Sequence, residues 1–255
     1  MINILLNGCC GHMGKVVADM CKYQKDVVIV GGIDLSAPEG DYGYPIFSSP
    51  AEVDIDFDVI IDFSNANCVP ALCEFAKNKK KGLVCCTTGI PEDVVSCLFD
   101  CSSSVPVFKS ANMSYGMNVL FEIVRMATKA LKDGSEIEII EAHHRRKLDA
   151  PSGTALMIAD VINEECDNKM DYVYDRSQRR SPRAQNEIGF SSIRGGNIVG
   201  EHEIMFIMDE EVVKISHSAS TRDVFARGAI MAAKFIANKA PGMYSMQDIT
   251  ANIFD

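Results

Sequence analysis

Histidine and positive charge are concentrated in one short stretch of an acidic chain, EAHHRRKLDAPSGTA at residues 141–155. The protein has 255 residues and a formal net charge of -10, yet His143 to Lys147 is an unbroken run of histidine, arginine and lysine. Histidine titrates near neutral pH and can deliver a proton, and lysine is a compact cation suited to a carboxylate. The stretch therefore predicts a site that holds a small polyanion and supplies a proton.

The residues after the basic run predict the start of a helix that binds an anion. Ser152 has the residue type of an N-cap, and Gly153 and Thr154 follow it. The N–H groups at a helix start point at an anion, preferably a carboxylate or a phosphate. We therefore expect this helix start to lie beside the basic cluster.

The neighbours of these residues are expected to play other parts. Adjacent residues on a strand point to opposite faces, so His143 and His144 should have different roles, one of which can be structural. We expect Asp149 and Glu141 to pair with a nearby cation instead of doing chemistry. The two arginines of the run are expected to be solvated or to lie at a subunit contact.

A second candidate site is the glycine-rich turn near the N-terminus. Gly8, Gly11 and Gly14 form G-x-x-G-x-x-G, a variant of the dinucleotide fingerprint, between an apolar run and a helical stretch. A second apolar run ends in Asp34, 20 residues after Gly14, the spacing expected of the acid that holds an adenosine ribose. The pattern predicts a dinucleotide site, and a glycine-rich turn without a ligand is the alternative interpretation.

Asp34 also bears on the choice of cofactor. Its carboxylate can accept hydrogen bonds from both ribose hydroxyls and would repel a 2′-phosphate, and the next residue, Leu35, offers no positive charge. We therefore expect NADH to be favoured over NADPH. The lysines at 79–81 would alter this balance if they lay near the ribose.

Two further turns lie where later strands of such a sheet should end, at residues 87–89 and 111–113. In open α/β sheets, ligands bind at the carboxyl ends of the strands. Both turns are therefore candidates to contact the nicotinamide half of the cofactor, and ordinary loop residues are the alternative.

The elements that must position these residues fall into two groups. Up to residue 114, apolar runs that read as buried strands are separated by helical stretches, which predicts a parallel sheet covered on both faces. The later part predicts an α+β unit whose extended segment, 188–220, forms an antiparallel sheet, while 167–186 is expected to be a loop. The expected strands are 2–6, 27–34, 58–64, 82–89, 105–114 and 136–144, and the expected helices are 15–23, 69–81, 117–132, 151–165 and 225–238.

Composition limits the other possibilities. No apolar run approaches the roughly 18 residues needed to cross a bilayer, and MINILLNGCCG reads as a first strand and not as a secretion signal. We therefore expect a cytoplasmic protein without a membrane partner, and the acidic balance argues against nucleic acid. The ten cysteines form no C-x-x-C and no zinc-finger spacing with histidine, so no metal site is expected. They are interpreted as packed, reduced thiols, with a redox or metal role as the alternative.

Taken in order along the chain, several segments resemble the dihydrodipicolinate reductase (4-hydroxy-tetrahydrodipicolinate reductase) family. They are GCCGHMG, VIIDFS, CCTTG, SANMSYGMN, EAHHRRKLDAPSGTA, RGGNIVGEH and HSASTRDVFARGA. The resemblance covers nearly the whole chain. It implies NAD(P)H-dependent reduction of 4-hydroxy-tetrahydrodipicolinate to tetrahydrodipicolinate, with loss of water, in the diaminopimelate route to lysine.

The same resemblance implies an architecture. A Rossmann-type dinucleotide-binding domain comprises 1–114 and is completed by 223–255. An inserted α+β domain, 115–222, binds the cyclic dicarboxylate substrate, and its sheet assembles a homotetramer.

The resemblance also assigns roles to residues. His143 is implied to be the general acid/base, and Lys147 its partner cation and proton donor. With Ser152 as the helix cap, the implied substrate-binding residues are His144, Ser152, Gly153, Thr154 and Arg222. The implied cofactor-binding residues are Gly8, Gly11, His12, Met13, Gly14, Asp34, Cys86, Thr87, Thr88, Ser110, Ala111, Asn112 and Met113.

Two of these positions depart from the family pattern. Cys86 stands where glycine is common, and Met113 stands where an aromatic residue is frequent. Neither change removes a group that does chemistry, so they bear on cofactor affinity and preference more than on activity.

Three other functions share part of the pattern. Another Rossmann dehydrogenase acting on a small carboxylate, such as an aspartate-type dehydrogenase, would not need the H-H-x-x-K and S-G-T arrangement. A non-enzymatic NAD(H)-binding regulator or redox sensor would suit the many cysteines, but it should carry a DNA- or protein-binding module, and no basic recognition helix is seen. A reductase-like protein that has lost its substrate is the third, and against it all the expected polar groups are present.

Overall fold

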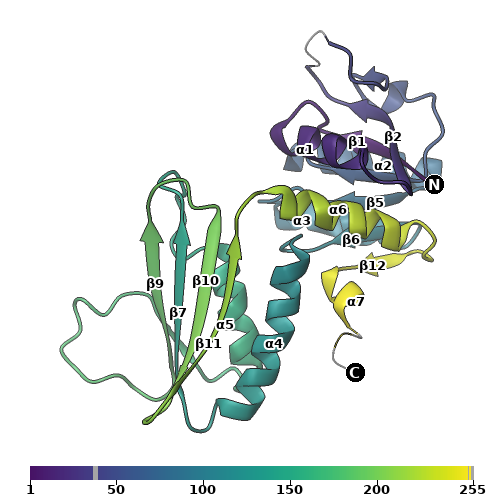
Figure 1. Cartoon of the computed structure of the whole chain (residues 1–255). Helices are drawn as coiled ribbons and strands as arrows, with labels where there is room; N and C mark the ends of the chain where they lie inside the picture. Colours follow the sequence, from purple (N-terminus) through teal and green to yellow (C-terminus); the bar gives the residue numbers. More distant parts are fainter. Residues whose placement is uncertain (37–39, 252, 254–255) are drawn as a thin grey trace. The chain divides into compact units, whose positions relative to one another are not determined.

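The chain folds into two compact units (Figure 1). This computed structural model describes residues 1–36, 40–251 and 253. Unit 1 comprises Met1–Tyr115 and Asp223–Asp255, and unit 2 comprises Gly116–Arg222. Each unit has its own sheet and hydrophobic core. Among the described residues, no helix is long and apolar enough to cross a membrane.

Unit 1 is built on a sheet of seven strands that all run parallel. The central apolar runs are buried along their whole length, as expected of a parallel sheet covered on both faces. In sheet order the strands are β12 (Gly242–Tyr244), β6 (Pro106–Lys109), β5 (Gly82–Cys85), β4 (Val59–Asp62), β1 (Ile2–Asn7), β2 (Val27–Ile33) and β3 (Ile46–Phe47). The predicted doubly wound parallel sheet is confirmed.

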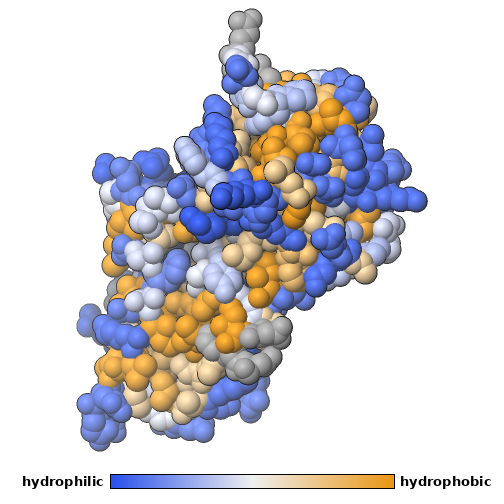
Figure 2. Space-filling model, turned by 45° about the vertical axis from the view of Figure 1, so that its right-hand side comes forward, coloured by the Kyte–Doolittle hydropathy of each residue, from blue (hydrophilic) through white to orange (hydrophobic). Residues whose placement is uncertain are grey.

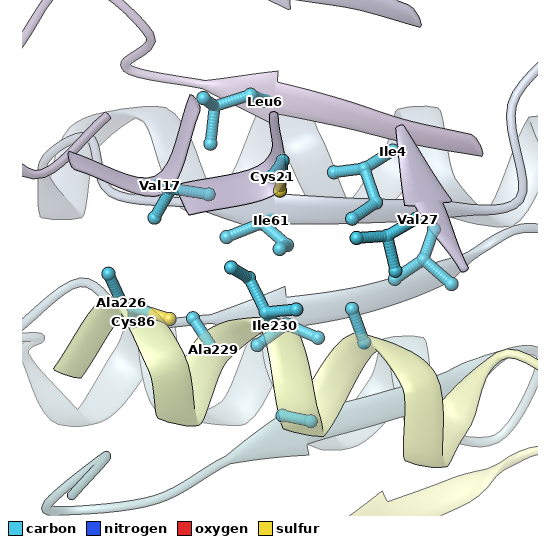
Figure 3. Packing of buried hydrophobic residues seen from close by; sticks show 14 of the residues in the cluster. Ile4, Leu6, Val17, Cys21, Val27, Ile61, Cys86, Ala226, Ala229 and Ile230 are labelled. Carbon is cyan, nitrogen blue, oxygen red and sulfur yellow. The ribbon is translucent and has the colours of Figure 1, made fainter. Parts of the chain in front are cut away.

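Successive side chains along each strand point to opposite faces of the sheet, so both faces of this sheet are apolar and helices cover both. On β1, Ile4 and Leu6 point into the core that α1 and α6 close, while Leu5 points into the core of α2 and α3. Figure 3 shows the first core, where small alanines of α6 face Ile4, Leu6 and Ile61. The helices of unit 1 are α1 (His12–Cys21), α2 (Val69–Lys79), α3 (Glu92–Ser102), α6 (Asp223–Ile236) and α7 (Met246–Thr250), with short 3-10 turns at Pro50–Glu52 and Ala66–Cys68.

Unit 2 is built on a five-stranded sheet with α4 (Tyr115–Leu131) and α5 (Gly153–Glu165) on one face (Figure 1). Core-facing residues alternate along the strands, so Ile137 and Ile139 of β7 are buried with Ile204 and Phe206 of β10. In sheet order the strands are β11 (Val212–Ala219), β10 (Gly200–Ile207), β7 (Glu136–His143), β9 (Glu187–Arg194) and β8 (Asp171–Val173).

The expectation of an antiparallel sheet in unit 2 is wrong for half of it. β10 is antiparallel to β7 and β11, but β9 is parallel to both β7 and β8. The chain between β7 and β9 passes through α5, and a long crossover of this kind returns a strand in the parallel direction. The predicted loop at 167–186 also contains the short strand β8.

Candidate functional site

The glycine turn of unit 1 leaves no room for side chains at two of its glycines. Gly8 has φ +75°, and a Cβ there would lie 2.7 Å from the carbonyl oxygen of Phe63. A Cβ at Gly14 would lie 2.2 Å from the carbonyl oxygen of Gly8. Gly11 caps α1 without a side-chain hydrogen bond, so the helix start keeps N–H groups for an anionic ligand. This cradle fits the pyrophosphate of a dinucleotide.

Asp34 follows β2 and lies against the same turn. Its carboxylate accepts hydrogen bonds from the backbone N–H of Cys10 at 2.9 Å and of Ser36 at 3.3 Å. It lines a pocket of about 530 Å³ together with Gly8, Gly11 and several serine and asparagine side chains. No lysine or arginine is among the described residues that line this pocket.

The lysines at 79–81 lie at the opposite edge of the sheet. They end α2 and directly precede β5, so they sit where the parallel strands begin, whereas the glycine turn follows the carboxyl end of β1. Lys81 pairs with Asp56 at 3.0 Å, and the Lys79 ammonium donates to the carbonyl of Val53 at 3.4 Å. These lysines therefore do not contribute to the pocket beside Asp34.

Asp62 organises the carboxyl edge of the sheet, although the sequence interpretation gave it no role. It is fully buried at the end of β4 and accepts hydrogen bonds from Asn7 Nδ2 at 2.8 Å and Thr87 Oγ1 at 2.7 Å. The carbonyl of Thr87 in turn accepts from Lys109 Nζ at 2.5 Å. Thr87 is thereby fixed between β4 and β6. The signal in the sequence was an aspartate ending an otherwise apolar run.

Cys86 and Met113 turn their side chains into the core. Both belong to the cluster under α6, where they are 7% and 5% exposed, and Figure 3 shows Cys86 beside Ala226. The Cys86 thiol thus packs between the sheet and α6, so only the backbone of Cys86 can contact a cofactor. Met113 lies against Gly228, where a Cβ would come within 1.7 Å of the Met113 carbonyl oxygen.

The remaining predicted cofactor residues follow strand ends or open α1. Among them, His12, Thr88 and Ala111 are exposed, whereas Met13, Ser110 and Asn112 are half-buried. Their backbone positions at the carboxyl ends of β1, β5 and β6 place them along one edge of the sheet.

In unit 2, Glu141 is the centre of a buried hydrogen-bond network. Its carboxylate lies 2.6 Å from His143 Nδ1 and accepts two hydrogen bonds from Arg194, at 2.6 and 2.8 Å. It also accepts from the backbone N–H of Ser152 at 3.2 Å. The side chain is 1% exposed, so this carboxylate ties the end of β7 to the start of α5.

The charges in this network settle the tautomer of His143. Burial raises the pKa of Glu141, but hydrogen bonds from Arg194 and His143 outweigh it and lower that pKa to about 2. An ionised carboxylate only accepts, so Nδ1 of His143 must donate. Burial lowers the pKa of His143, and the bond to Glu141 opposes that shift. Nε2 is then the nitrogen left to exchange a proton with a substrate.

Glycine at position 200 keeps that nitrogen accessible. A Cβ there would lie 3.1 Å from His143 Nε2. The ring of His143 also packs edge-on against His202, with ring centroids 5.3 Å apart. Burial, followed by the nearby His143, lowers the pKa of His202 to about 4, so this second ring stays neutral.

His202 supports the start of α5. Its Nε2 lies 3.1 Å from Ser152 Oγ, and this oxygen accepts from the backbone N–H of Ala155 at 3.2 Å. The predicted N-cap is thus present and is fixed by a histidine that the sequence interpretation left unassigned. His202 stands at one of the alternating core-facing positions of β10. This position in an alternating strand was the signal from which its buried role could have been predicted.

A carboxylate already occupies the anion position at the start of α5. Asp149 Oδ1 lies 3.0 Å from Lys147 Nζ. Burial raises the pKa of Asp149, but Lys147 and, to a smaller extent, the nearby backbone N–H of Gly153 lower it overall. The expected pairing of Asp149 with a cation is confirmed. Lys147 and the helix start therefore hold one carboxylate group between them.

The other expected substrate residues are less closely tied to this cluster. His144 is half-buried, and its Nδ1 has no hydrogen-bond partner among the described residues. Arg222 is exposed, and no hydrogen bond in the described part of the chain joins it to His143 or Lys147.

All ten cysteines are free thiols, and the six buried ones are packed inside the cores of unit 1. Burial raises the pKa of Cys21 to about 11 and those of Cys9 and Cys85 to about 12. These thiols are protonated at neutral pH, which suits the predicted structural role.

Comparisons with known proteins agree along the whole chain. A family model described as "Dihydrodipicolinate reductase, N-terminus" matches residues 2–113, and one described as "Dihydrodipicolinate reductase, C-terminus" matches residues 116–250. A 4-hydroxy-tetrahydrodipicolinate reductase of Caldanaerobacter subterraneus subsp. tengcongensis is 45% identical over 249 residues, 98% of this chain and 98% of the relative. One of Clostridium botulinum is 43% identical over 250 residues, again 98% of each chain.

Solved structures show the same fold. A dipicolinate-bound dihydrodipicolinate reductase from Paenisporosarcina sp. TG-14 matches with a TM-score of 0.78 and 20% identity, covering 98% of this chain and 99% of that chain. A diaminopimelate (DAP) dehydrogenase of C. glutamicum matches with a TM-score of 0.56 and 15% identity, over 96% of this chain and 92% of that chain.

Proposed function

The chain belongs to the dihydrodipicolinate reductase family, and we propose that it reduces 4-hydroxy-tetrahydrodipicolinate to tetrahydrodipicolinate with a hydride from NADH. Water is lost overall, and the reaction stands in the diaminopimelate route to lysine. The relatives named for this activity match nearly the whole chain, so both the nucleotide-binding unit and the unit with the basic cluster are included.

The observation that carries the proposal is the carboxylate held between Lys147 and the start of α5. The substrate is a cyclic dicarboxylate, and its carboxylate needs a cation and N–H donors at one place. Lys147 Nζ and the Gly153 N–H can supply both, because Lys147 pairs with Asp149 at 3.0 Å and the Gly153 N–H lies near the same carboxylate. We assign them to one substrate carboxylate, which takes the place of Asp149, with His144, Ser152, Thr154 and Arg222 completing the substrate-binding set.

His143 and Lys147 handle the proton. NADH supplies the hydride when it is bound. Glu141 holds His143 with Nδ1–H pointing inward, so Nε2 exchanges the proton as general acid/base. Lys147 neutralises the carboxylate beside it and acts as the partner proton donor. In this mechanism Glu141 and Arg194 never touch the substrate, and they set the orientation and charge of the imidazole.

NADH is proposed in preference to NADPH. Asp34 can accept hydrogen bonds from ribose hydroxyls and would repel a 2′-phosphate. Support comes from the absence of lysine and arginine among the described lining residues and from the distant placement of the lysines at 79–81. The other residues assigned to the cofactor are Gly8, Gly11, His12, Met13, Gly14, Cys86, Thr87, Thr88, Ser110, Ala111, Asn112 and Met113.

We further propose a cytoplasmic homotetramer that assembles through unit 2. Several large hydrophobic side chains of this unit are exposed, such as Ile193 at 52% and Met126 at 53%. Figure 2 shows hydrophobic residues gathered in patches on the surface of the molecule. A partner subunit would remove such surface from water.

The test is a coupled assay that follows NADH or NADPH oxidation by absorbance. Pyruvate, aspartate semialdehyde and a dihydrodipicolinate synthase generate the unstable substrate in place. Oxidation that needs every component supports the proposed reaction, and the two nucleotides compared at equal concentration test the preference. Tight nucleotide binding without oxidation would contradict the assigned substrate.

A further inference from the structure

We propose that Cys9, Cys10 and Asp34 form a binding site for a soft divalent cation such as Zn²⁺, and that this cation and the dinucleotide exclude each other. The two thiol sulfurs and a carboxylate oxygen all lie within 4.8 Å of one another. Nowhere else in the described residues do three such side chains meet in this way. The second half of the proposal rests on the proposed function.

The spacing of the sulfurs matches a tetrahedral metal. Cys9 Sγ and Cys10 Sγ are 3.8 Å apart. Two Zn–S bonds of about 2.3 Å at a tetrahedral angle put the sulfurs about 3.8 Å apart as well. A cation can therefore bridge the two thiolates without a change in their separation.

The three ligands are held in place before any cation binds. The backbone N–H of Cys10 donates to Asp34 Oδ2 at 2.9 Å, which keeps the carboxylate beside the cysteines. Cys9 is packed against Gly32, where a Cβ would lie 2.5 Å from its sulfur. A site formed in advance in this way needs little ordering on binding.

The chemistry of the ligands selects the cation. Two thiolates and one carboxylate favour Zn²⁺ or Cd²⁺ over Mg²⁺ and Ca²⁺, which prefer oxygen ligands. Cys9 is 1% exposed, whereas Cys10 and Asp34 are half-buried, so the cation enters from their side and keeps a position open to water. Binding forms two metal–sulfur bonds and one metal–oxygen bond and releases both thiol protons to solvent.

Competition follows from the shared carboxylate. The dinucleotide needs Asp34 for its ribose and the glycine turn for its pyrophosphate, and both cysteines lie within that turn, between Gly8 and Gly11. A cation bound to Asp34 withdraws that acceptor. NADH affinity should therefore fall as the cation site fills.

The experiment titrates the full-length, metal-free protein with Cd²⁺ and follows the thiolate-to-metal charge-transfer absorbance. Cys10→Ser and Cys9→Ser each remove one sulfur. Cys97→Ser is the matched control because this half-buried thiol of α3 hydrogen-bonds to the carbonyl of Asp93 in its own helix and lies outside the proposed site. NADH affinity is measured by fluorescence without and with Zn²⁺, in the absence of substrate. Asp34→Asn is read by absorbance alone, because this side chain also belongs to the proposed cofactor site.

We expect one equivalent of Cd²⁺ to saturate the parent and the Cys97→Ser protein. Loss of either sulfur should weaken binding by at least about 10-fold, and Zn²⁺ should weaken NADH binding in the parent but not in Cys10→Ser. Absorbance that persists in both serine variants would overturn the site. Saturation that leaves NADH affinity unchanged would overturn the competition. A metal-free protein that binds no NADH would instead count against the proposed function, while the absorbance would still test the site.

Discussion

Replacement of Glu141 by glutamine tests the network around His143 most directly. The pKa of the Glu141 carboxyl falls from its ordinary value of 4.5 to about 2 in the folded protein. This shift corresponds to about 3 kcal/mol of folding free energy at neutral pH. Because the folded pKa lies below the ordinary one, this contribution is present above pH 4.5 and is lost as the pH falls toward 2. The Glu141→Gln protein should be less stable at pH 7, and its stability should lose that acid-dependent step.

The same substitution should change catalysis through His143. Burial lowers the pKa of His143, and the Glu141 carboxylate opposes that shift, so glutamine should lower the pKa further. Less imidazole is then protonated at neutral pH, and the orientation of Nε2 is less well fixed. We expect kcat to fall about 100- to 10,000-fold, the range of general acid–base catalysis, with the optimum shifted to lower pH.

The assay is kcat as a function of pH in the coupled reaction, with denaturant unfolding measured on the same proteins. Glu138→Gln is the matched control, because Glu138 lies on the same strand and is paired with Arg176 and Arg183. It should leave the pH profile unchanged even if it costs stability. A Glu141→Gln protein that unfolds more easily but keeps the parental kcat and pH profile would refute the orienting role.

Three further predictions address the other parts of the site. His143→Gln should lower kcat by about 100- to 10,000-fold with little effect on NADH affinity, measured by fluorescence, and unchanged turnover would remove His143 from the acid role. Asp34→Ala should weaken NADH binding by about 10- to 100-fold because charged hydrogen bonds to the ribose are lost, and it should weaken NADPH binding by less. A parent protein that binds NADPH more tightly than NADH would contradict the reasoning. Asp149→Asn should lower KM for the substrate, and the inhibition constant of pyridine-2,6-dicarboxylate, by about 2- to 5-fold, because an exposed competitor of Lys147 is weakened. A raised KM would show that Asp149 helps to build the site.

Much of unit 1 could be predicted because its signals are local. Apolar runs, a glycine turn and Asp34 lie within one βαβ segment, and their spacing carries the information. The short strands β3 and β12 and the helix α3 were not foreseen. β3 has two residues and β12 three, so neither shows a period of its own, and both form only by pairing with an existing edge strand.

Asp62 and His202 illustrate what spacing does not reveal. Asp62 acts on Asn7 and Thr87, which lie 55 and 25 residues away in the sequence. His202 acts on Ser152 across 50 residues. Their partners are fixed by which strands are neighbours, and a single sequence does not specify the order of strands in a sheet.

The Glu141 network depends on a feature of unit 2 that was predicted wrongly, the direction of β9. In the observed parallel register, His143 pairs with Arg194 and Glu141 with Ser192, so the guanidinium lies beside both the carboxylate and the imidazole. An antiparallel β9 running from the same residues would carry Arg194 toward the other end of β7, away from Glu141. The crossover through α5 therefore does two things at once. It places the start of α5 beside Glu141, and it returns β9 in the direction that delivers Arg194 to the same carboxylate.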